Sequence, residues 1–109
     1  MKMIIAIVRP EKYDEVKEAL KTIGVMGMTF THVTGRGKQA GIKFTNRVGD
    51  IIVDEIEKVK LEIVLDSDEL VEKAVDTIGR TACTGHAGDG RVFIVPVEKA
   101  YTISSYCSQ

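Results

Sequence analysis

The sequence has no tryptophan, only three phenylalanines and three tyrosines, and no long apolar run. A membrane-spanning helix needs about 20 consecutive apolar residues, and no stretch approaches that length. Residues 1–8 combine a lysine with a short apolar stretch, but no small-residue cleavage site follows, so they are not typical of a secretory signal. We therefore expect a cytoplasmic protein without direct membrane insertion.

The sequence also has few cysteines and nearly balanced charge. Cys83 and Cys107 are too few for a disulfide framework, and no CxxC or Cys/His cluster indicates a bound metal, so we expect two free thiols. Fifteen Lys and Arg residues face sixteen Asp and Glu residues, a net charge of −1. A general nucleic-acid binder needs a basic excess, so nucleic acid is not an expected partner, although a small local anion site is compatible with this balance.

The 109 residues fit a single domain, 1–109, and an apolar content of 44% argues against disorder. Apolar residues at spacings of three and four follow Pro10 and stop at Gly24, which predicts a first helix. Asp66 and Glu69 have the spacing of a capping box, which predicts the start of a second helix. Strands are predicted by apolar or alternating patterns at residues 3–8, 28–34, 59–65 and 91–97.

This order predicts an α+β fold, a ferredoxin-like βαββαβ two-layer sandwich with a long loop between the second and third strands. The strands at 3–8 and 92–97 are apolar on both faces, whereas two helices cover only one face of a four-stranded sheet. Leaving the other face in water is costly for a small domain. A second copy of the sheet is the expected cover, hence a homo-oligomer; a helix formed by the tail is the alternative.

The segment between Gly35 and Glu57 is longer than the roughly 12–15 residues usual for a loop without structure. Such a segment is a functional loop, a partner contact or a tolerated insertion. Its apolar end, residues 51–53, is either an extra strand or a contact surface.

Two glycine-rich segments, 35–41 and 84–91, each follow one half of the predicted fold. Glycines let backbone N–H groups converge on an anion, and Lys38 and Arg91 add charge. A phosphate site is one interpretation of both segments; a flexible turn at 35–41 and a hairpin-like turn at 84–91 are the others. Lys58 and Lys60 also have two interpretations: they contact an anion, or they belong to a solvated strand edge.

No catalytic set is evident. His32 is expected on a strand, His86 on a loop, and neither has a nucleophile nearby in the sequence. Ser67 is better explained by the start of the second helix. A small enzyme is therefore the least favoured class of function.

The chain resembles the nitrogen-regulatory PII signalling proteins along nearly its whole length. The run Thr-Gly-His-Ala-Gly-Asp-Gly-Arg-Val-Phe at 84–93 and the block 35–41 are specific features of this resemblance. Shorter matches lie at residues 7–12, 25–29, 53–54 and 58–60.

The resemblance implies a homotrimer that binds ATP or ADP between subunits, with Mg²⁺ and 2-oxoglutarate beside the phosphates, and that is not an enzyme. The long loop at 36–57 would bind a target protein, such as an ammonium channel or an enzyme of nitrogen metabolism. Gln39 would be the Mg²⁺ ligand, and Gln39, Lys58 and Arg9 would bind 2-oxoglutarate. The nucleotide would contact Ile7, Thr29, Gly35, Gly37, Lys38, Gln39, Glu62, Val64, Gly88, Asp89, Gly90 and Arg91.

The sequence also departs from the family pattern. Lys38 and Arg91 exchange the usual arginine and lysine, which moves the hydrogen-bonding fork. Ile51 stands where many bacterial members have a modifiable tyrosine, so uridylylation there is excluded. In the divergent tail, 98–109, Thr102 and Ser104 replace two arginines that reach the neighbour's nucleotide. The alternative function is accordingly a divergent sensor of another adenine nucleotide or metabolite, regulating carbon metabolism or transport.

Overall fold

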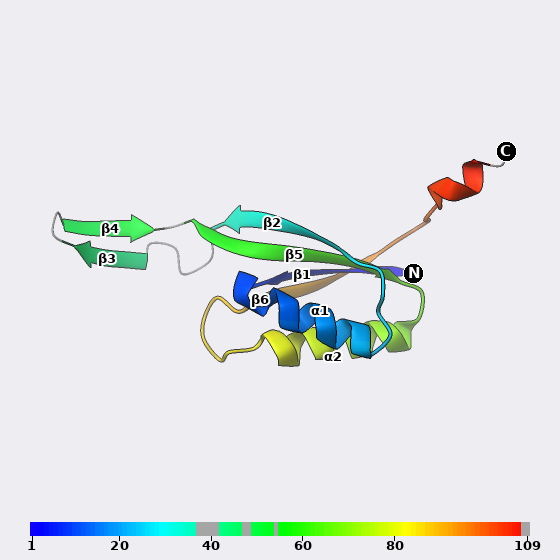
Figure 1. Ribbon diagram of the computed structural model, residues 1–109, viewed down its shortest axis with the longest axis horizontal. Helices are drawn as coiled ribbons and strands as arrows, with labels where there is room; N and C mark the ends of the chain where they lie inside the picture. The colour runs from blue at the N-terminus through cyan, green and yellow to red at the C-terminus, as the bar shows by residue number, and fades with distance from the viewer. Residues whose placement is uncertain (37–41, 47–48, 54, 108–109) are drawn as a thin grey trace.

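The computed structural model describes residues 1–36, 42–46, 49–53 and 55–107, with the backbone alone for 42–46 and 49–53. The main strands and helices alternate along the chain (Figure 1). They are β1 (Lys2–Val8), α1 (Tyr13–Thr22), β2 (Thr29–Gly35), β3 (Ile42–Asn46), β4 (Gly49–Val53), β5 (Ile56–Leu65), α2 (Asp68–Ala82) and β6 (Gly90–Pro96), with the short 3₁₀ helices Pro10–Lys12 and Ile103–Tyr106.

Four strands form an antiparallel sheet in the order β2-β5-β1-β6. Both long helices pack on the same face of this sheet, as Figure 1 shows. The predicted ferredoxin-like βαββαβ sandwich is therefore confirmed. Within the described part of the chain, no helix has the length and apolar character that a membrane crossing requires.

The hydrophobic core lies between the sheet and the two helices. Burying an Ile, Leu or Val side chain contributes about 1.5–3 kcal/mol, so these contacts dominate the stability of the subunit. The fully buried larger side chains are Ile4 and Val8 of β1, Val16 and Leu20 of α1, Val59, Leu61 and Ile63 of β5, and Val71 and Ile78 of α2.

The start of α2 differs in detail from the prediction. Ser67, not Asp66, is the N-cap: its backbone is extended, and its hydroxyl oxygen accepts a hydrogen bond from the Leu70 N–H at 3.2 Å. A cap hydroxyl suits this geometry because it reaches the N–H three residues later. The interpretation of Ser67 as part of a helix start is confirmed.

The sequence predicts a long loop between β2 and β5. The structure shows that this connection is not one continuous loop. It contains the antiparallel pair β3 and β4, which lies beyond the ends of β2 and β5 in Figure 1. The extra-strand interpretation of residues 51–53 is therefore correct. In addition, β5 begins at Ile56, earlier than predicted, so Lys58 lies inside the strand.

The second face of the sheet has no helix over it. Directly opposed residues of antiparallel strands share a face, and the registers place Met3, Ile5 and Ile7 of β1 on the side away from the core. We call this side the open face. Its other members are Thr29, Thr31 and Val33 of β2, Lys58, Lys60, Glu62 and Val64 of β5, and Arg91, Phe93 and Val95 of β6.

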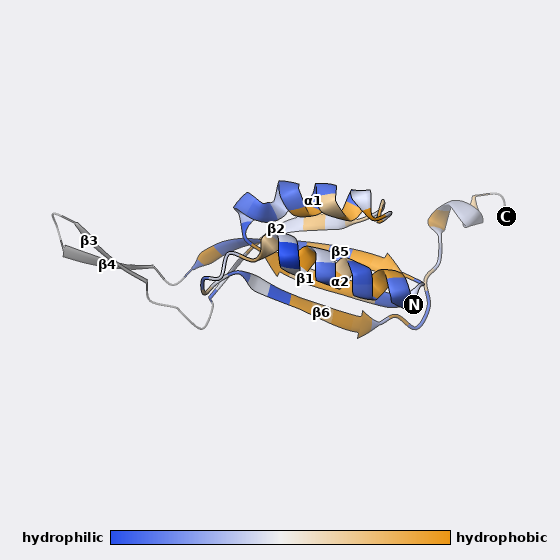
Figure 2. Ribbon diagram, turned by 90° about the horizontal axis from the view of Figure 1, so that it is seen from below, coloured by the Kyte–Doolittle hydropathy of each residue, from blue (hydrophilic) through white to orange (hydrophobic). Residues whose placement is uncertain are grey.

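The open face has an apolar end and a charged end. Val64, Phe93 and Val95 are 49%, 43% and 37% exposed, which is unusual for a group of large apolar side chains. Figure 2 shows the corresponding hydrophobic colour along β5 and β6, in contrast to the polar outer sides of the helices. No helix of the described residues therefore covers the apolar end of this face.

The chain after β6 does not supply that cover. It runs away from the sheet and ends in the short helix Ile103–Tyr106 (Figure 1), where Ile103 is 84% exposed. The tail-helix alternative is therefore wrong for the single chain.

Candidate functional site

The basic side chains of the open face gather at the end where β1 finishes and β5 and β6 begin. Lys60 and Arg91 both lie opposite Ile7, on its two sides, and Lys58 lies opposite Val33. The guanidinium of Arg91 stands 5.5 Å from the ring centroid of Phe93, which orients it along the open face. The connection from α2 to β6 and the exit from β2 lie at this same end of the sheet (Figure 1).

The connection between α2 and β6, residues 83–89, leads into β6 through glycines that no other residue can replace without strain. Gly85, Gly88 and Gly90 have φ angles of +84°, +93° and +114°, in the region that side chains with a Cβ rarely adopt. At Gly90 a Cβ would lie 1.8 Å from the carbonyl oxygen of Ile7. The close approach of this loop to β1 therefore depends on glycine.

Asp89 fixes the shape of this loop. Its carboxylate accepts hydrogen bonds from the backbone N–H groups of Thr84 at 2.8 Å and Gly85 at 3.1 Å, and from the Thr84 hydroxyl. It also forms an ion pair with the Arg9 guanidinium at 3.0 Å. These contacts, the Thr84 hydroxyl foremost, hold the pKa of Asp89 well below its usual range.

Two cations from the sheet contact carbonyl groups of the same loop. Arg9 donates to the carbonyl oxygen of Ala87 at 2.8 Å, and the Lys58 ammonium donates to that of Gly88. Burial lowers the pKa of Lys58, and the neighbouring Arg9 charge lowers it further. The Glu11 and Asp89 carboxylates offset part of this effect, and Asp89 is already paired with Arg9.

The residues expected to hold an adenosine group also share the open face. Thr29 and Glu62 lie directly opposite each other on β2 and β5, and Val64 is the next residue of β5 on that face. Ile7 lies on β1 beside the basic end. The structure thus brings the expected adenosine residues onto one surface.

The two glycine segments do not meet within one chain. Gly35 ends β2 and Gly90 begins β6, and these strands are the two edges of the sheet. Three strand spacings separate them, roughly 14 Å at about 4.8 Å each, which exceeds the reach of one phosphate group. Within one chain the two segments therefore lie at opposite edges of the sheet.

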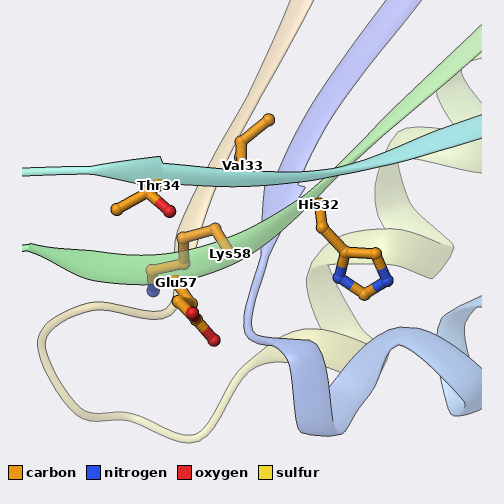
Figure 3. Close-up of a pocket in the computed structure, with 5 residues that line it drawn as sticks. All are labelled: His32, Val33, Thr34, Glu57 and Lys58. Carbon is orange, nitrogen blue, oxygen red and sulfur yellow. The ribbon is translucent and has the colours of Figure 1, made fainter.

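Two shallow depressions border this region. One, of about 280 Å³, lies along β2 and β5 (Figure 3). Its lining residues are His32, Val33, Thr34, Glu57 and Lys58. In Figure 3 His32 points toward the helices and Val33 lies on the other side of β2, so the depression wraps around the strand edge.

The other depression, of about 180 Å³, lies between α2 and the start of β6, and Ile7, Asp89, Gly90 and Arg91 border it. Both volumes fall below the roughly 300–1,000 Å³ typical of small-molecule sites. Neither depression of the single chain therefore has the size of a typical small-molecule site.

Several predicted positions lie outside the described residues: Gly37, Lys38 and Gln39 of the nucleotide site, with Gln39 also the expected Mg²⁺ ligand. The side chain of Ile51 lies outside them as well. Among the described residues, no group of three or more His, Cys, Asp or Glu side chains could hold a metal ion. Cys83 and Cys107 are free and exposed.

The contacts within the 83–89 connection were not predicted from the sequence. Thr84 and the Ala87 carbonyl were not singled out, and Arg9 was considered only as an anion contact. The glycine and charge pattern of 84–91 indicated a phosphate site or a turn, but nothing in the sequence pairs Arg9 with a residue 80 positions away.

Comparison with known proteins places the sequence in a family. The family model described as "Nitrogen regulatory protein P-II" matches residues 1–106. A nitrogen regulatory protein P-II of Bradyrhizobium diazoefficiens is 48% identical over 103 residues, 94% of this chain and 91% of the relative.

Archaeal relatives are equally similar. Nitrogen regulatory protein P-II 2 of Methanothermobacter thermautotrophicus is 48% identical over 94% of this chain and 89% of the relative. A nitrogen fixation nifHD region GlnB-like protein 1 of Methanobacterium ivanovii is 48% identical over 94% of this chain and 93% of its own length. The chain belongs to the nitrogen regulatory protein P-II family, whose members are effector-binding signal transducers and not enzymes.

Proposed function

We propose that the protein is a homotrimeric sensor of ATP or ADP and of 2-oxoglutarate, and that it regulates nitrogen metabolism by binding a target protein. The observation that carries this proposal is that the glycine-rich 84–90 loop meets Lys58 and Arg91 at the basic end of the open face, because backbone N–H groups beside cations suit a phosphate. The single domain, 1–109, would supply the trimer contact, the nucleotide surface and the target-binding segment.

The apolar end of the open face supports the trimer. Phe93, Val64 and Val95 are exposed in one chain, and their burial against two further copies would remove this apolar surface from water. Such packing also brings the edge of one sheet toward the opposite edge of another. Gly35 of one subunit and Gly90 of the next would then line the same cleft, although they lie at opposite edges of one sheet.

The nucleotide fits the chemistry of this cleft. A phosphate chain is an anion that backbone N–H groups and cations bind well, and an arginine such as Arg91 offers a bidentate fork. Thr29 and Glu62 provide polar groups beside apolar Ile7 and Val64, as an adenosine group requires. The full proposed set on this chain is Ile7, Thr29, Gly35, Gly37, Lys38, Gln39, Glu62, Val64, Gly88, Asp89, Gly90 and Arg91.

The proposed 2-oxoglutarate site lies at Lys58 and Arg9, with Gln39. The two cations stand close enough for the Arg9 charge to lower the pKa of Lys58, so a dicarboxylate between them would relieve their repulsion. Mg²⁺ would join the phosphates to the Gln39 oxygen, since this ion prefers oxygen ligands and is held partly by substrate phosphates.

The segment 36–57 is the proposed target-binding element. It follows Gly35, the last residue of β2 and part of the proposed nucleotide surface. It ends inside β5, just before Lys58. Ligands at both points would bias its conformation, and the target would bind the conformation that they favour. An ammonium channel or an enzyme of nitrogen metabolism is the proposed class of target.

Isothermal titration calorimetry with ATP, ADP, AMP and cyclic AMP, each with and without Mg²⁺ and 2-oxoglutarate, tests the proposal. We expect 2-oxoglutarate to bind only with Mg-ATP. Absence of this binding, together with tight binding of another nucleotide, would favour the alternative function, a divergent sensor for carbon metabolism or transport. The tail with Thr102 and Ser104 motivates this alternative, because it supplies no arginine to the phosphates.

A further inference from the structure

The carboxylate of Asp89 is fully engaged within its own chain. One oxygen accepts from the Arg9 Nε and the Thr84 hydroxyl, and the other accepts from the N–H groups of Thr84 and Gly85. Only 23% of its side chain is exposed. A carboxylate with four donors has its main lone-pair directions occupied, so little of it is available to a ligand.

The charge of Asp89 also opposes direct contact with the proposed ligand. Phosphate and carboxylate are both anions, and their approach is unfavourable unless a cation lies between them. Here Arg9 neutralises the carboxylate from the side of β1. The Asp89 carboxylate therefore supports the loop from within and does not face a bound phosphate.

The contacts of the loop carbonyls decide where its N–H groups point. The carbonyl oxygen of Ala87 faces Arg9 and that of Gly88 faces Lys58. In a trans peptide the C=O and the following N–H point in opposite directions, and none of the peptide bonds in the described residues is cis. The N–H groups of Gly88 and Asp89 therefore point away from the two cations, as successive donors of an anion-binding concavity do.

From these contacts we infer that Asp89 is a positioning residue: through Thr84 and Arg9 it holds the 84–90 loop in the conformation that presents its backbone N–H groups to phosphate. This inference rests on the proposed function and assigns a different role to one of its residues. The side chain acts through the backbone, and the nucleotide contacts the N–H groups that it orients.

The test compares Asp89→Asn with the wild-type trimer in two measurements. The first is amide hydrogen exchange of residues 84–90 without nucleotide, and the second is the Kd for Mg-ATP. Asparagine has the shape of aspartate but carries no negative charge. Its side-chain NH₂ group would face donors such as the N–H groups of Thr84 and Gly85 or the Arg9 guanidinium. We expect at least tenfold faster exchange and about tenfold weaker binding, the loss typical of one charge-assisted hydrogen bond.

A direct-ligand role gives a different result. If Asp89 contacts the nucleotide or its metal ion, Asp89→Asn weakens binding while exchange in the nucleotide-free protein stays at the wild-type rate. That outcome overturns the inference. Unchanged exchange and unchanged affinity overturn it as well.

Thr84 provides a matched pair of variants that keeps the test decisive if Asp89→Asn does not fold. Thr84→Ser retains the hydroxyl and should keep the wild-type exchange rate and Kd. Thr84→Val has the same shape as threonine without the donor, and we expect faster loop exchange and a higher Kd. Equal behaviour of the two variants contradicts the inference.

The wild-type protein separates this inference from the proposed function. If wild-type protein binds no adenine nucleotide, the proposed function fails, whereas exchange in the variants still shows whether Asp89 orders the loop. If wild-type protein binds and the exchange of Asp89→Asn is unchanged, only the inference fails.

Discussion

Gly90 and Ile7 approach so closely that a Cβ on Gly90 would lie 1.8 Å from the Ile7 carbonyl oxygen. The φ angle of Gly90 is +114°, so conformation and space both require glycine. This relationship ties the start of β6 to the end of β1 and sets the distance between the 84–90 loop and the basic side chains of the sheet.

The variant Gly90→Ala should therefore lose the loop geometry. The methyl group must displace the backbone of β1 or β6, and strain of this kind costs about 1–3 kcal/mol. We expect a lower free energy of unfolding and a loss of nucleotide binding of at least tenfold, measured by urea denaturation and calorimetry.

Gly27→Ala is the matched control, because nothing lies within 4 Å of a Cβ there and its φ angle is not positive. It should leave both the free energy of unfolding and nucleotide binding near wild type. Wild-type affinity in Gly90→Ala would show that the close approach does not shape the site.

The apolar end of the open face supplies a second prediction. Phe93→Glu places a charge on a surface that the proposed trimer buries, and an unpaired buried charge opposes association. Sedimentation equilibrium should give three times the 12.0 kDa chain mass for wild type and a smaller mass for the variant.

Met26→Glu is the control for this experiment. Met26 is 73% exposed in the connection between α1 and β2, away from the open face, so the variant should sediment like wild type. A Phe93→Glu protein that keeps the wild-type mass would contradict the proposed role of the open face.

The fold followed from the sequence because its evidence is local and repeated. One hydrophobic core explains three patterns: the apolar run of β1, the apolar residues spaced by three and four before Gly24, and the alternation in β5. Together these patterns predict the observed order of elements. Ser67 and Asp66 were harder to separate, since both residue types cap helices and only backbone geometry decides between them.

The site was predicted only in part because its internal contacts join residues far apart in the sequence. Glycine and charge patterns indicated the 84–91 segment, whereas the pairing of Arg9 with Asp89 depends on how β1 and β6 align. Of the pair β3 and β4, the sequence indicated only a possible strand at 51–53, because two five-residue strands are too short to show a clear periodicity.

The low pKa of Asp89 predicts how the stability depends on pH. Because the folded state lowers this pKa, the contribution of the carboxylate is present above the unfolded value near 4 and is lost as the pH falls toward the folded value. The difference in urea midpoint between wild type and Asp89→Asn should be constant from pH 7 to 5. It should shrink only gradually below pH 4, and a difference that has vanished by pH 5 would contradict the network of Thr84 and Arg9 around Asp89.

Lys58→Ala should lose the proposed response to 2-oxoglutarate without losing the fold. Burial and the Arg9 charge lower the pKa of Lys58, so the folded state holds its ammonium form less favourably than the unfolded chain does. Removing the ammonium relieves that repulsion, and we expect the variant to remain trimeric. Binding of 2-oxoglutarate with Mg-ATP should weaken more than tenfold, because a charge-assisted contact is worth about 1.5–3 kcal/mol.

Lys60→Ala is the matched control for Lys58→Ala, since Lys60 lies two residues along β5 on the same face. Its ammonium stands 3.9 Å from the Glu62 carboxylate, so its charge already has an acidic neighbour. Calorimetry should give wild-type 2-oxoglutarate binding for this variant. If both variants weaken binding equally, the effect belongs to the general positive charge of the sheet end, and Lys58 is not a specific contact. If only Lys58→Ala loses binding, the carboxylate site lies where Arg9, Lys58 and the Gly88 carbonyl converge.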